Sequence, residues 1–214
     1  MGPSGAGKST LLNILSATTY PDSPESWVSW LFPDGTELSW SSDGPSSAEL
    51  TLLRRDYFGF AFQDSHLIPH LTVAEALTFG RCNRGESFGD AMDRAREAVA
   101  KAFGGEERRQ RRILGSFPHQ LSGGERQRAS LLMALVRDPF VLFADEPTGS
   151  LDRDTRLDVM NLLIDWIDRD KMLIWVTHHE KDPSDTHSTA RLLVSDGTVL
   201  LEEVSGASSD MVIA

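Results

Sequence analysis

The sequence has little cysteine, no long apolar run and no excess of positive charge. Its single cysteine, Cys82, excludes an intrachain disulfide and fits the reducing cytosol. The longest apolar runs, such as Leu131–Val136 and Phe140–Ala144, fall well short of the roughly 18 residues that a membrane-spanning helix needs. The 32 acidic residues outnumber the 21 basic ones, and the net charge of −11 argues against binding to nucleic acid through phosphate neutralisation. We therefore expect an acidic cytosolic protein that does not bind nucleic acid.

What is present is the composition of a folded domain. The 214 residues suffice for one domain, because domains commonly contain roughly 100–200 residues. Hydrophobic residues make up 40% and charged residues 25% of the sequence, which is typical of globular proteins and not of disordered ones. We expect a single domain, so its function must be sought in local motifs.

The first motif is a phosphate-binding loop that matches G-x-x-x-x-G-K-[ST]. It consists of Gly2, Pro3, Ser4, Gly5, Ala6, Gly7, Lys8, Ser9 and Thr10. In such a loop, backbone N–H groups surround polyphosphate oxygens, the lysine reaches the β- and γ-phosphates, and the serine hydroxyl ligates Mg²⁺. Apolar residues at positions 11, 12, 14 and 15 predict a helix that points its positive end at the anion. An ordinary Gly/Ser turn is the alternative, which the full register of the motif disfavours.

The start of the sequence is unusual for this motif, because only Met1 precedes Gly2. A phosphate loop normally follows a buried parallel strand. Loss of such a strand would remove on the order of 10 kcal/mol of burial, against a typical net stability of about 5–15 kcal/mol. We expect that the first core strands are missing by truncation and that the chain alone is unstable or inactive. A start assigned at an internal methionine and a fold that tolerates the gap are the alternatives.

The rest of the chain divides by composition and periodicity. We expect a partial catalytic core with a Trp-rich β-hairpin over residues 1–63, a helical subdomain over 64–120, more catalytic core over 121–204 and a tail over 205–214. Apolar spacing predicts helices over residues 50–55, 88–103, 125–136 and 155–168, and strands over 58–62, 140–144, 172–176, 191–194 and 198–201.

Two acidic residues follow one of these strands. Val141–Ala144 is apolar and leads directly into Asp145 and Glu146. In nucleotide hydrolases the first such acid holds Mg²⁺ or its water shell, and the second polarises the attacking water. Apolar runs that end in Asp-Glu are common, so this pattern alone is weak evidence. It becomes strong evidence together with the phosphate loop, because the two motifs must converge across one sheet.

A second glycine-rich segment precedes the helix expected from residue 125. Ser122, Gly123 and Gly124 lie where the helix begins, and a helix N-terminus favours anions. One ATP does not need two such sites in one subunit, so we expect Ser122 and Gly124 to contact the γ-phosphate held by another subunit. Residues 121–125 read Leu-Ser-Gly-Gly-Glu, and here the sequence resembles the ATP-binding cassette (ABC) family, which has this signature motif.

The resemblance implies further site residues. Gln63 is similar to the glutamine that contacts Mg²⁺ and the attacking water, and Asp152 to the aspartate that runs along the dimer interface. His178 is similar to the histidine that senses the γ-phosphate and contributes to catalysis, with His179 as the neighbouring alternative. The implied fold is an α/β phosphate-loop ATPase with a mainly parallel core sheet, a small antiparallel β piece and a helical subdomain. The family's adenine-stacking aromatic residue is missing, and the Trp-rich hairpin is a substitute to consider.

The function implied by the resemblance is that of the ATP-hydrolysing subunit of an ABC transporter, nearest to the lipoprotein-releasing, macrolide-exporting and cell-division types. Two copies would enclose two ATP–Mg²⁺ head to tail, with Ser9, Gln63 and Asp145 at the metal and Glu146 activating water. The subunit would lie on the inner face of the cell membrane, bound to a permease. The alternatives are a soluble ABC ATPase without a transport role and an inactive truncated nucleotide-binding module.

Overall fold

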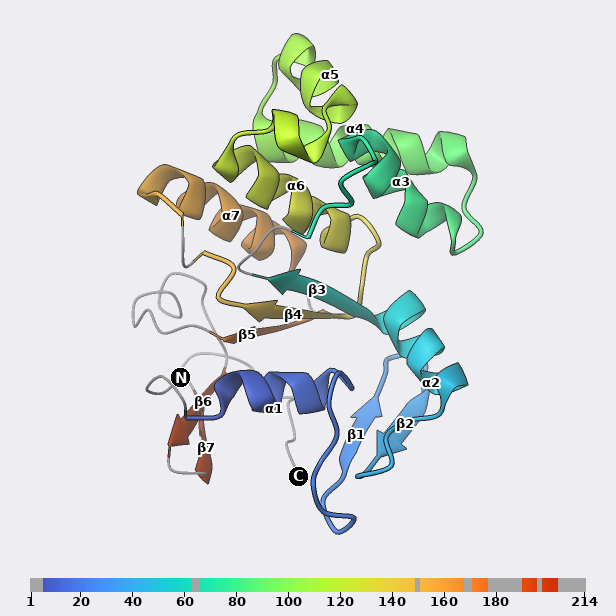
Figure 1. The fold of residues 1–214 in the computed structure, drawn as a ribbon, viewed down its shortest axis with the longest axis vertical. Helices are drawn as coiled ribbons and strands as arrows, with labels where there is room; N and C mark the ends of the chain where they lie inside the picture. Colours follow the sequence, from blue (N-terminus) through green and yellow to red (C-terminus); the bar gives the residue numbers. More distant parts are fainter. Residues whose placement is uncertain are drawn as a thin grey trace.

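The computed structural model describes residues 6–62, 66–148, 151–167, 171–176, 190–195 and 198–203. Helices and strands follow one another along the chain as Figure 1 shows. The elements are α1 (Lys8–Leu15), β1 (Val28–Leu31), β2 (Glu37–Trp40), α2 (Ser47–Leu52), the π-helical turn η1 (Leu53–Tyr57), β3 (Phe58–Phe62), α3 (Val73–Cys82), α4 (Phe88–Phe103), α5 (Glu107–Gly115), the 3₁₀ turn η2 (Pro118–Gln120), α6 (Gly123–Leu135), β4 (Val141–Asp145), α7 (Arg153–Trp166), β5 (Met172–Val176), β6 (Ala190–Ser195) and β7 (Thr198–Glu203).

The central sheet has the strand order β3-β4-β5, and both pairs are parallel. Residues 141–144 of β4 are buried on both faces, as expected for the middle strand of a parallel sheet. Phe62, Asp145 and Val176 lie opposite one another in the register, so the three strands end on the same row. This parallel sheet with helices on its faces confirms the predicted α/β fold class.

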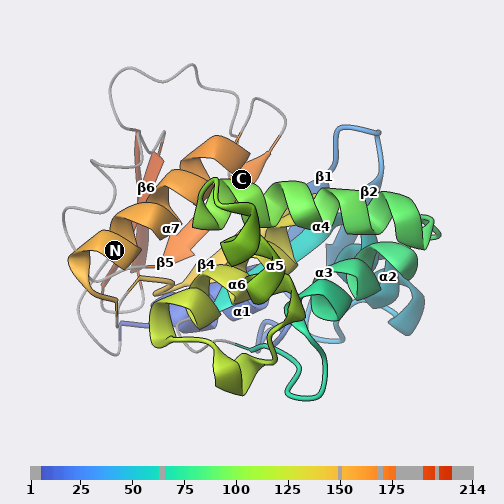
Figure 2. The same cartoon turned by 90° about the horizontal axis from the view of Figure 1, so that it is seen from above.

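The two faces of this sheet carry different helices (Figures 1 and 2). Val141 and Phe143 of β4 pack in a cluster with α1 and the hairpin, whereas Leu142 and Ala144 pack with α6 and α7. Successive side chains of a strand point to opposite faces, so α1 and α6 lie on opposite sides of the sheet.

The hairpin of β1 and β2 packs on the sheet through its tryptophans. Trp30 and Trp40 are buried, whereas Trp27 is 64% exposed. The indole Nε1–H of Trp30 donates to the carbonyl of Leu15 at 3.0 Å, at the end of α1. Trp30 and Trp40 thus stabilise the core, and Gly35 at φ +83° makes the turn that connects the two strands.

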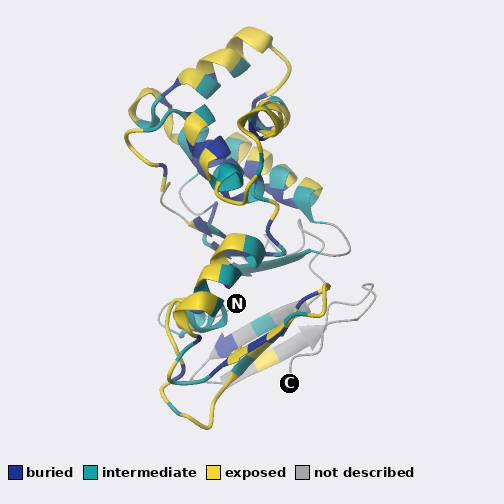
Figure 3. Cartoon of the chain, turned by 90° about the vertical axis from the view of Figure 1, so that its right-hand side faces the viewer, coloured by how far each residue is buried: buried dark blue, intermediate teal, exposed yellow. Residues whose placement is uncertain are grey.

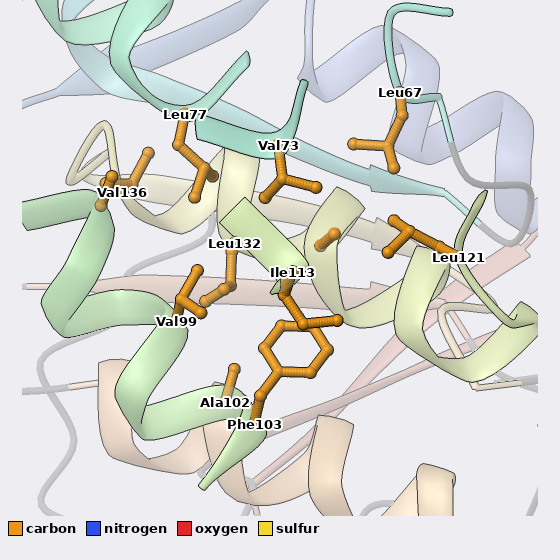
Figure 4. Packing of buried hydrophobic residues seen from close by; sticks show 12 residues of the cluster. Leu67, Val73, Leu77, Val99, Ala102, Phe103, Ile113, Leu121, Leu132 and Val136 are labelled. Atoms are coloured by element: carbon orange, nitrogen blue, oxygen red, sulfur yellow. The ribbon is translucent and has the colours of Figure 1, made fainter. Parts of the chain in front are cut away.

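The helical subdomain has its own core between α3, α4, α5 and α6 (Figure 4). α4 has the predicted bounds and begins where Ser87 accepts a hydrogen bond from the Asp90 N–H. The outer sides of these helices are largely exposed (Figure 3). Helix α6 contributes Ala129 and Leu132 to this core and Leu131 to the cluster against the sheet, so it connects the two parts of the molecule.

Two remaining features complete the architecture. β6 and β7 form a separate antiparallel pair. The helix expected over residues 50–55 begins earlier, at Ser47, because Ser46 and Glu49 form a capping box, and it continues into the π-helical turn η1. In the described part of the chain, no helix combines the length and apolarity needed to cross a membrane.

Candidate functional site

The phosphate-binding loop enters helix α1 at Gly7. Gly7 has φ +94°, a conformation that glycine adopts without a Cβ penalty, and no side chain caps the helix there. The first N–H groups of α1 therefore do not donate to a side chain at this N-cap, as expected for an anion-binding helix start. Gly2, Pro3, Ser4 and Gly5 lie outside the described residues, whereas Ala6 to Thr10 lie within them.

Ser9 and Asp145 are brought together by α1 and β4. The Ser9 hydroxyl hydrogen-bonds to the half-buried Asp145 carboxylate at the end of the strand. Burial raises the pKa of Asp145, and the neighbouring Glu146 charge raises it further, whereas Ser9 and the Lys8 charge act in the opposite direction. The net pKa of Asp145 is raised, because burial disfavours the charged carboxylate more than Ser9 and Lys8 favour it.

The chemistry of this pair fits magnesium. Ser9 and Asp145 offer a hydroxyl and a carboxylate, which are the oxygen ligands that Mg²⁺ prefers. Within the described ranges, no group of three or more His, Cys, Asp or Glu could hold a metal ion. A protein contribution of one or two oxygens is usual where Mg²⁺ takes its other ligands from phosphates and water.

Glu146 follows Asp145 with an unusual backbone. Its φ is +46°, in the left-handed region that costs a residue with a Cβ roughly 1–2 kcal/mol. Its N–H donates to the Val176 carbonyl of β5 at 2.9 Å, so the neighbouring strand holds this conformation. Strained residues of this kind concentrate at functional sites, where the surrounding structure maintains them.

The predicted signature motif forms the start of α6. The Ser122 hydroxyl accepts a hydrogen bond from the Glu125 N–H at 3.3 Å, and the Ser122 N–H donates to the Glu125 carboxylate at 3.1 Å. This capping bond uses an acceptor lone pair of the hydroxyl and not its hydrogen, which can therefore still be donated to a phosphate. Burial acts to raise the pKa of Glu125, but the hydrogen bonds from Ser122 and the ion pair with Arg112 outweigh burial and lower it.

The two signature glycines differ in their surroundings. A Cβ on Gly124 would lie 2.8 Å from Oγ1 of Thr155 on α7, whereas a Cβ on Gly123 would have nothing within 4 Å. Thr155 is in turn fixed by Asp152, which accepts from the Thr155 N–H at 3.1 Å and from its hydroxyl at 2.8 Å. These hydrogen bonds lower the pKa of Asp152. The structure therefore places the predicted dimer-interface aspartate beside the signature segment of the same chain.

The two helix starts that are predicted to bind anions lie on opposite faces of the sheet. Gly7 begins α1 on one face and Ser122 precedes α6 on the other (Figure 1). That Ser122 and Gly124 contact the γ-phosphate held by another subunit stays a prediction.

Besides residues 2–5, the predicted site residues Gln63 and His178 lie outside the described residues, as does the alternative His179. Gln63 directly follows Phe62 of β3, and residues 177 and 178 follow Val176 of β5. Phe62, Asp145 and Val176, the last residues of the three strands, lie on one row.

Gln127 is a residue of this region that the sequence analysis did not single out. It lies on α6 with 7% of its surface exposed, and its Nε2 donates to the carbonyls of Phe62 at 2.9 Å and Pro147 at 3.1 Å. The sequence contains only a weak indication that Gln127 is buried. This residue lies one turn after the helix start, and Ala129 to Leu132 follow it.

Comparison with known proteins identifies the family. A family model described as "ABC transporter" matches residues 1–149. The chain belongs to the ABC transporter family. This membership confirms the resemblance inferred from the phosphate loop and the signature motif.

The relatives of this chain include an ATP-binding protein of similar length and longer export ATP-binding/permease proteins. The lipoprotein-releasing system ATP-binding protein LolD of Aquifex aeolicus is 34% identical over 94% of this chain and 83% of its own length. The macrolide export ATP-binding/permease protein MacB of Burkholderia thailandensis is 36% identical over 98% of this chain. The chain spans 31% of MacB and 29% of the probable syringafactin export ATP-binding/permease protein SyfD of Pseudomonas syringae.

Among solved structures, the ABC cassette MJ0796 has a similar fold. Its dimeric post-hydrolysis state with bound ADP and Pi matches with a TM-score of 0.77 and 33% sequence identity, covering 97% of this chain and 84% of that chain. A second dimeric structure of the same cassette matches equally well. The predicted ABC-ATPase fold is therefore confirmed.

Proposed function

We propose that this chain is the ATP-binding and ATP-hydrolysing part of an ABC transporter. The observation that carries the proposal is the contact between Ser9, at the start of α1, and Asp145, at the end of β4, in a chain of this family. It joins the phosphate-loop helix to the acidic end of the strand, which is where a nucleotide hydrolase needs a metal-bound phosphate.

Each residue then has a chemical role. The loop over residues 2–9 and Lys8 bind the phosphates of ATP, and Ser9 and Asp145, with Gln63, hold Mg²⁺. The ion supplies positive charge that offsets the phosphate charge. Glu146, held by its backbone bond to Val176, accepts a proton from the attacking water. His178 contacts the γ-phosphate.

A second copy of the chain completes the site. Ser122, Gly123 and Gly124 lie at the start of α6, across the sheet from α1 (Figure 1), which supports a role at the nucleotide of the partner copy. We assign Asp152 to the same interface. The dimeric structures of the relative MJ0796 support this arrangement. The resulting head-to-tail dimer has two composite sites.

The motion of this dimer acts on a permease. Relatives named as export ATP-binding/permease proteins support such a partner, present as a separate subunit or as another part of the same polypeptide. The chain would then lie on the cytoplasmic face of the membrane, with the helical subdomain and the segment at Gln63 receiving the partner.

The substitution Glu146→Gln tests the proposal in the full-length natural protein. We expect ATP turnover to fall about 100-fold or more, because the amide cannot accept the proton, while ATP and Mg²⁺ still bind and produce a stable dimer in size-exclusion chromatography. The exposed Glu97 on α4 provides the control Glu97→Gln, which should leave turnover unchanged.

The outcomes separate the alternatives. Turnover close to wild type in the Glu146→Gln protein contradicts the assigned role of this residue. Absence of ATP binding in the wild-type protein indicates an inactive nucleotide-binding module. Turnover and dimerisation without any association with a permease indicate an ABC ATPase that does not act in transport.

A further inference from the structure

One buried side-chain amide connects two strand ends to the signature helix. Gln127 is buried, since 7% of its surface is exposed, and it lies in the second turn of α6. Both Nε2 hydrogen bonds go to backbone carbonyls, those of Phe62 at 2.9 Å and Pro147 at 3.1 Å. An amide nitrogen has two hydrogens, so its donor capacity is fully used.

The two acceptors are adjacent in sequence to residues of the proposed catalytic site. Phe62 is the last residue of β3 and directly precedes Gln63, and Pro147 directly follows Glu146. Helix α6 itself begins directly after Ser122. Three segments with proposed roles in ATP hydrolysis therefore meet at the side chain of Gln127.

The backbone of Glu146 is held from two directions. Its own N–H donates to Val176 of β5, and the carbonyl of the next residue, Pro147, accepts from Gln127. Because Glu146 has φ +46°, its conformation depends on neighbours that prevent relaxation. Proline at position 147 has no N–H, so the carbonyl is the one backbone hydrogen-bonding group through which this residue is held.

We propose that Gln127 is a positioning residue, which fixes the backbones that carry Glu146 and Gln63 relative to the signature helix. This inference rests on the proposed function, because it assigns Gln127 to the same hydrolytic site. No other side chain of similar shape replaces it well. Methionine has a similar length but no donor, glutamate accepts instead of donating, and asparagine is one methylene group too short to reach both carbonyls.

The neighbouring side chains of α6 have different partners. Arg126 donates to the carbonyl of Leu121 within its own segment, and Arg128 pairs with Asp158 on α7. The contact to the strand ends is thus specific to Gln127. Ser130 is buried to nearly the same extent on the same helix and is a matched control.

The test compares Gln127→Met with Ser130→Ala in the full-length natural protein. We expect Gln127→Met to lower kcat about 10-fold or more, because displacements of about 1 Å at reacting groups can cost roughly 100-fold. KM and the Kd for ATP should stay within about 3-fold of wild type, since the phosphate loop is untouched. Ser130→Ala should leave kcat unchanged. A purely structural role would lower the melting temperature without this separation of kcat from KM.

A second variant guards against loss of folding. Gln127→Asn keeps the amide and should also lower kcat, because its donor does not reach both carbonyls. A kcat within about 2-fold of wild type in a folded Gln127→Met or Gln127→Asn protein overturns the inference. Failure of both variants to fold also overturns it, because Gln127 would then be needed for the fold itself.

The proposed function is tested independently in the same series. Wild-type turnover and its loss in Glu146→Gln do not depend on Gln127. A normal rate in Gln127→Met beside an inactive Glu146→Gln protein would therefore refute only the positioning role.

Discussion

Gly124 and Thr155 are in such close contact that position 124 has no room for a side chain. A Cβ there would lie 2.8 Å from Oγ1 and 2.9 Å from Cγ2 of Thr155. The β-branched Thr155 cannot swing away easily, because its hydroxyl is bonded to Asp152 at 2.8 Å. The second signature glycine is therefore required by the packing between α6 and α7, independently of its proposed contact with phosphate.

This contact predicts opposite effects for the two signature glycines. Gly124→Ala should destabilise the fold by about 1–3 kcal/mol through overpacking. Gly123→Ala should be neutral or slightly stabilising, because its Cβ meets open space in a helix. Chemical denaturation of both variants measures the difference. A double-mutant cycle with Thr155→Ala should recover most of the loss from Gly124→Ala, and two equally stable glycine variants would contradict the packing argument.

The raised pKa of Asp145 predicts a pH-dependent effect of Asp145→Asn. Between the ordinary carboxyl pKa and the higher value in the fold, the folded chain binds more protons than the unfolded one, so wild-type stability falls as the pH rises. The amide of the variant carries no charge, so Asp145→Asn should raise the melting temperature without nucleotide at about pH 7. The gain should vanish below about pH 4, where the carboxyl is protonated in both states.

Magnesium and ATP should reverse that order, because the ionised carboxylate then has a cation beside it. Thermal melts with and without Mg–ATP check both statements, and Asp93→Asn on the exposed face of α4 is the control. If Mg–ATP raises the melting temperature of Asp145→Asn as much as that of the wild type, Asp145 is not part of the metal site.

The indole of Trp30 should matter to the end of helix α1. Trp30→Phe removes the hydrogen bond to the Leu15 carbonyl and part of a buried ring, which should cost about 1–2 kcal/mol. Trp27→Phe, at a side chain that is 64% exposed, should have no measurable effect. Equilibrium unfolding in urea tests the pair. If Trp30→Phe and Trp27→Phe lose similar amounts of unfolding free energy, the packing of Trp30 does not hold the hairpin in place.

If each ATP site is shared between two copies of the chain, two inactive variants should complement each other. Lys8→Ala impairs the phosphate loop. Ser122→Asp keeps an N-cap residue but places a negative charge where we propose that the phosphate of the partner copy binds. Each homodimer should be inactive, whereas an equal mixture should recover about a quarter of the wild-type rate, because half of its dimers have one intact site.

The control for this mixture is Ser87→Asp, at the N-cap of α4, which should remain active. Rates in mixtures of the two inactive variants, measured at several ratios, test the arrangement. A mixture as inactive as its components would contradict sites shared between copies.

Hydrophobic periodicity predicted those helices and strands whose burial follows from the local sequence. α4 and β5 have the predicted bounds, because the apolar spacing of α4 is typical of a helix and the continuous apolar run of β5 is typical of a parallel strand. The split of the helix around Leu53 into α2 and a π-helical turn was not predicted, because it depends on how the chain must enter β3.

In the candidate site too, the sequence predicts local features and not those that depend on the folded chain. The motifs predicted Lys8, Ser9, Asp145 and Glu146 as site residues, since phosphate and metal chemistry restrict the residue types. They could not identify the left-handed backbone of Glu146 or the contacts of Gln127, because both depend on segments that meet only in the folded chain. For Gly124, sequence reasoning supplied a possible ligand contact, and the structure adds a packing constraint.

The shared last row of the three parallel strands restricts how this protein can evolve in length. Phe62, Asp145 and Val176 are in register, so inserting one residue within β3, β4 or β5 would turn the following side chains to the wrong face. Two inserted residues would restore the face but advance that strand end by about 6.6 Å past its neighbours. Viable insertions and deletions should therefore accumulate in connections such as the hairpin turn at Gly35, while these strands keep a constant length.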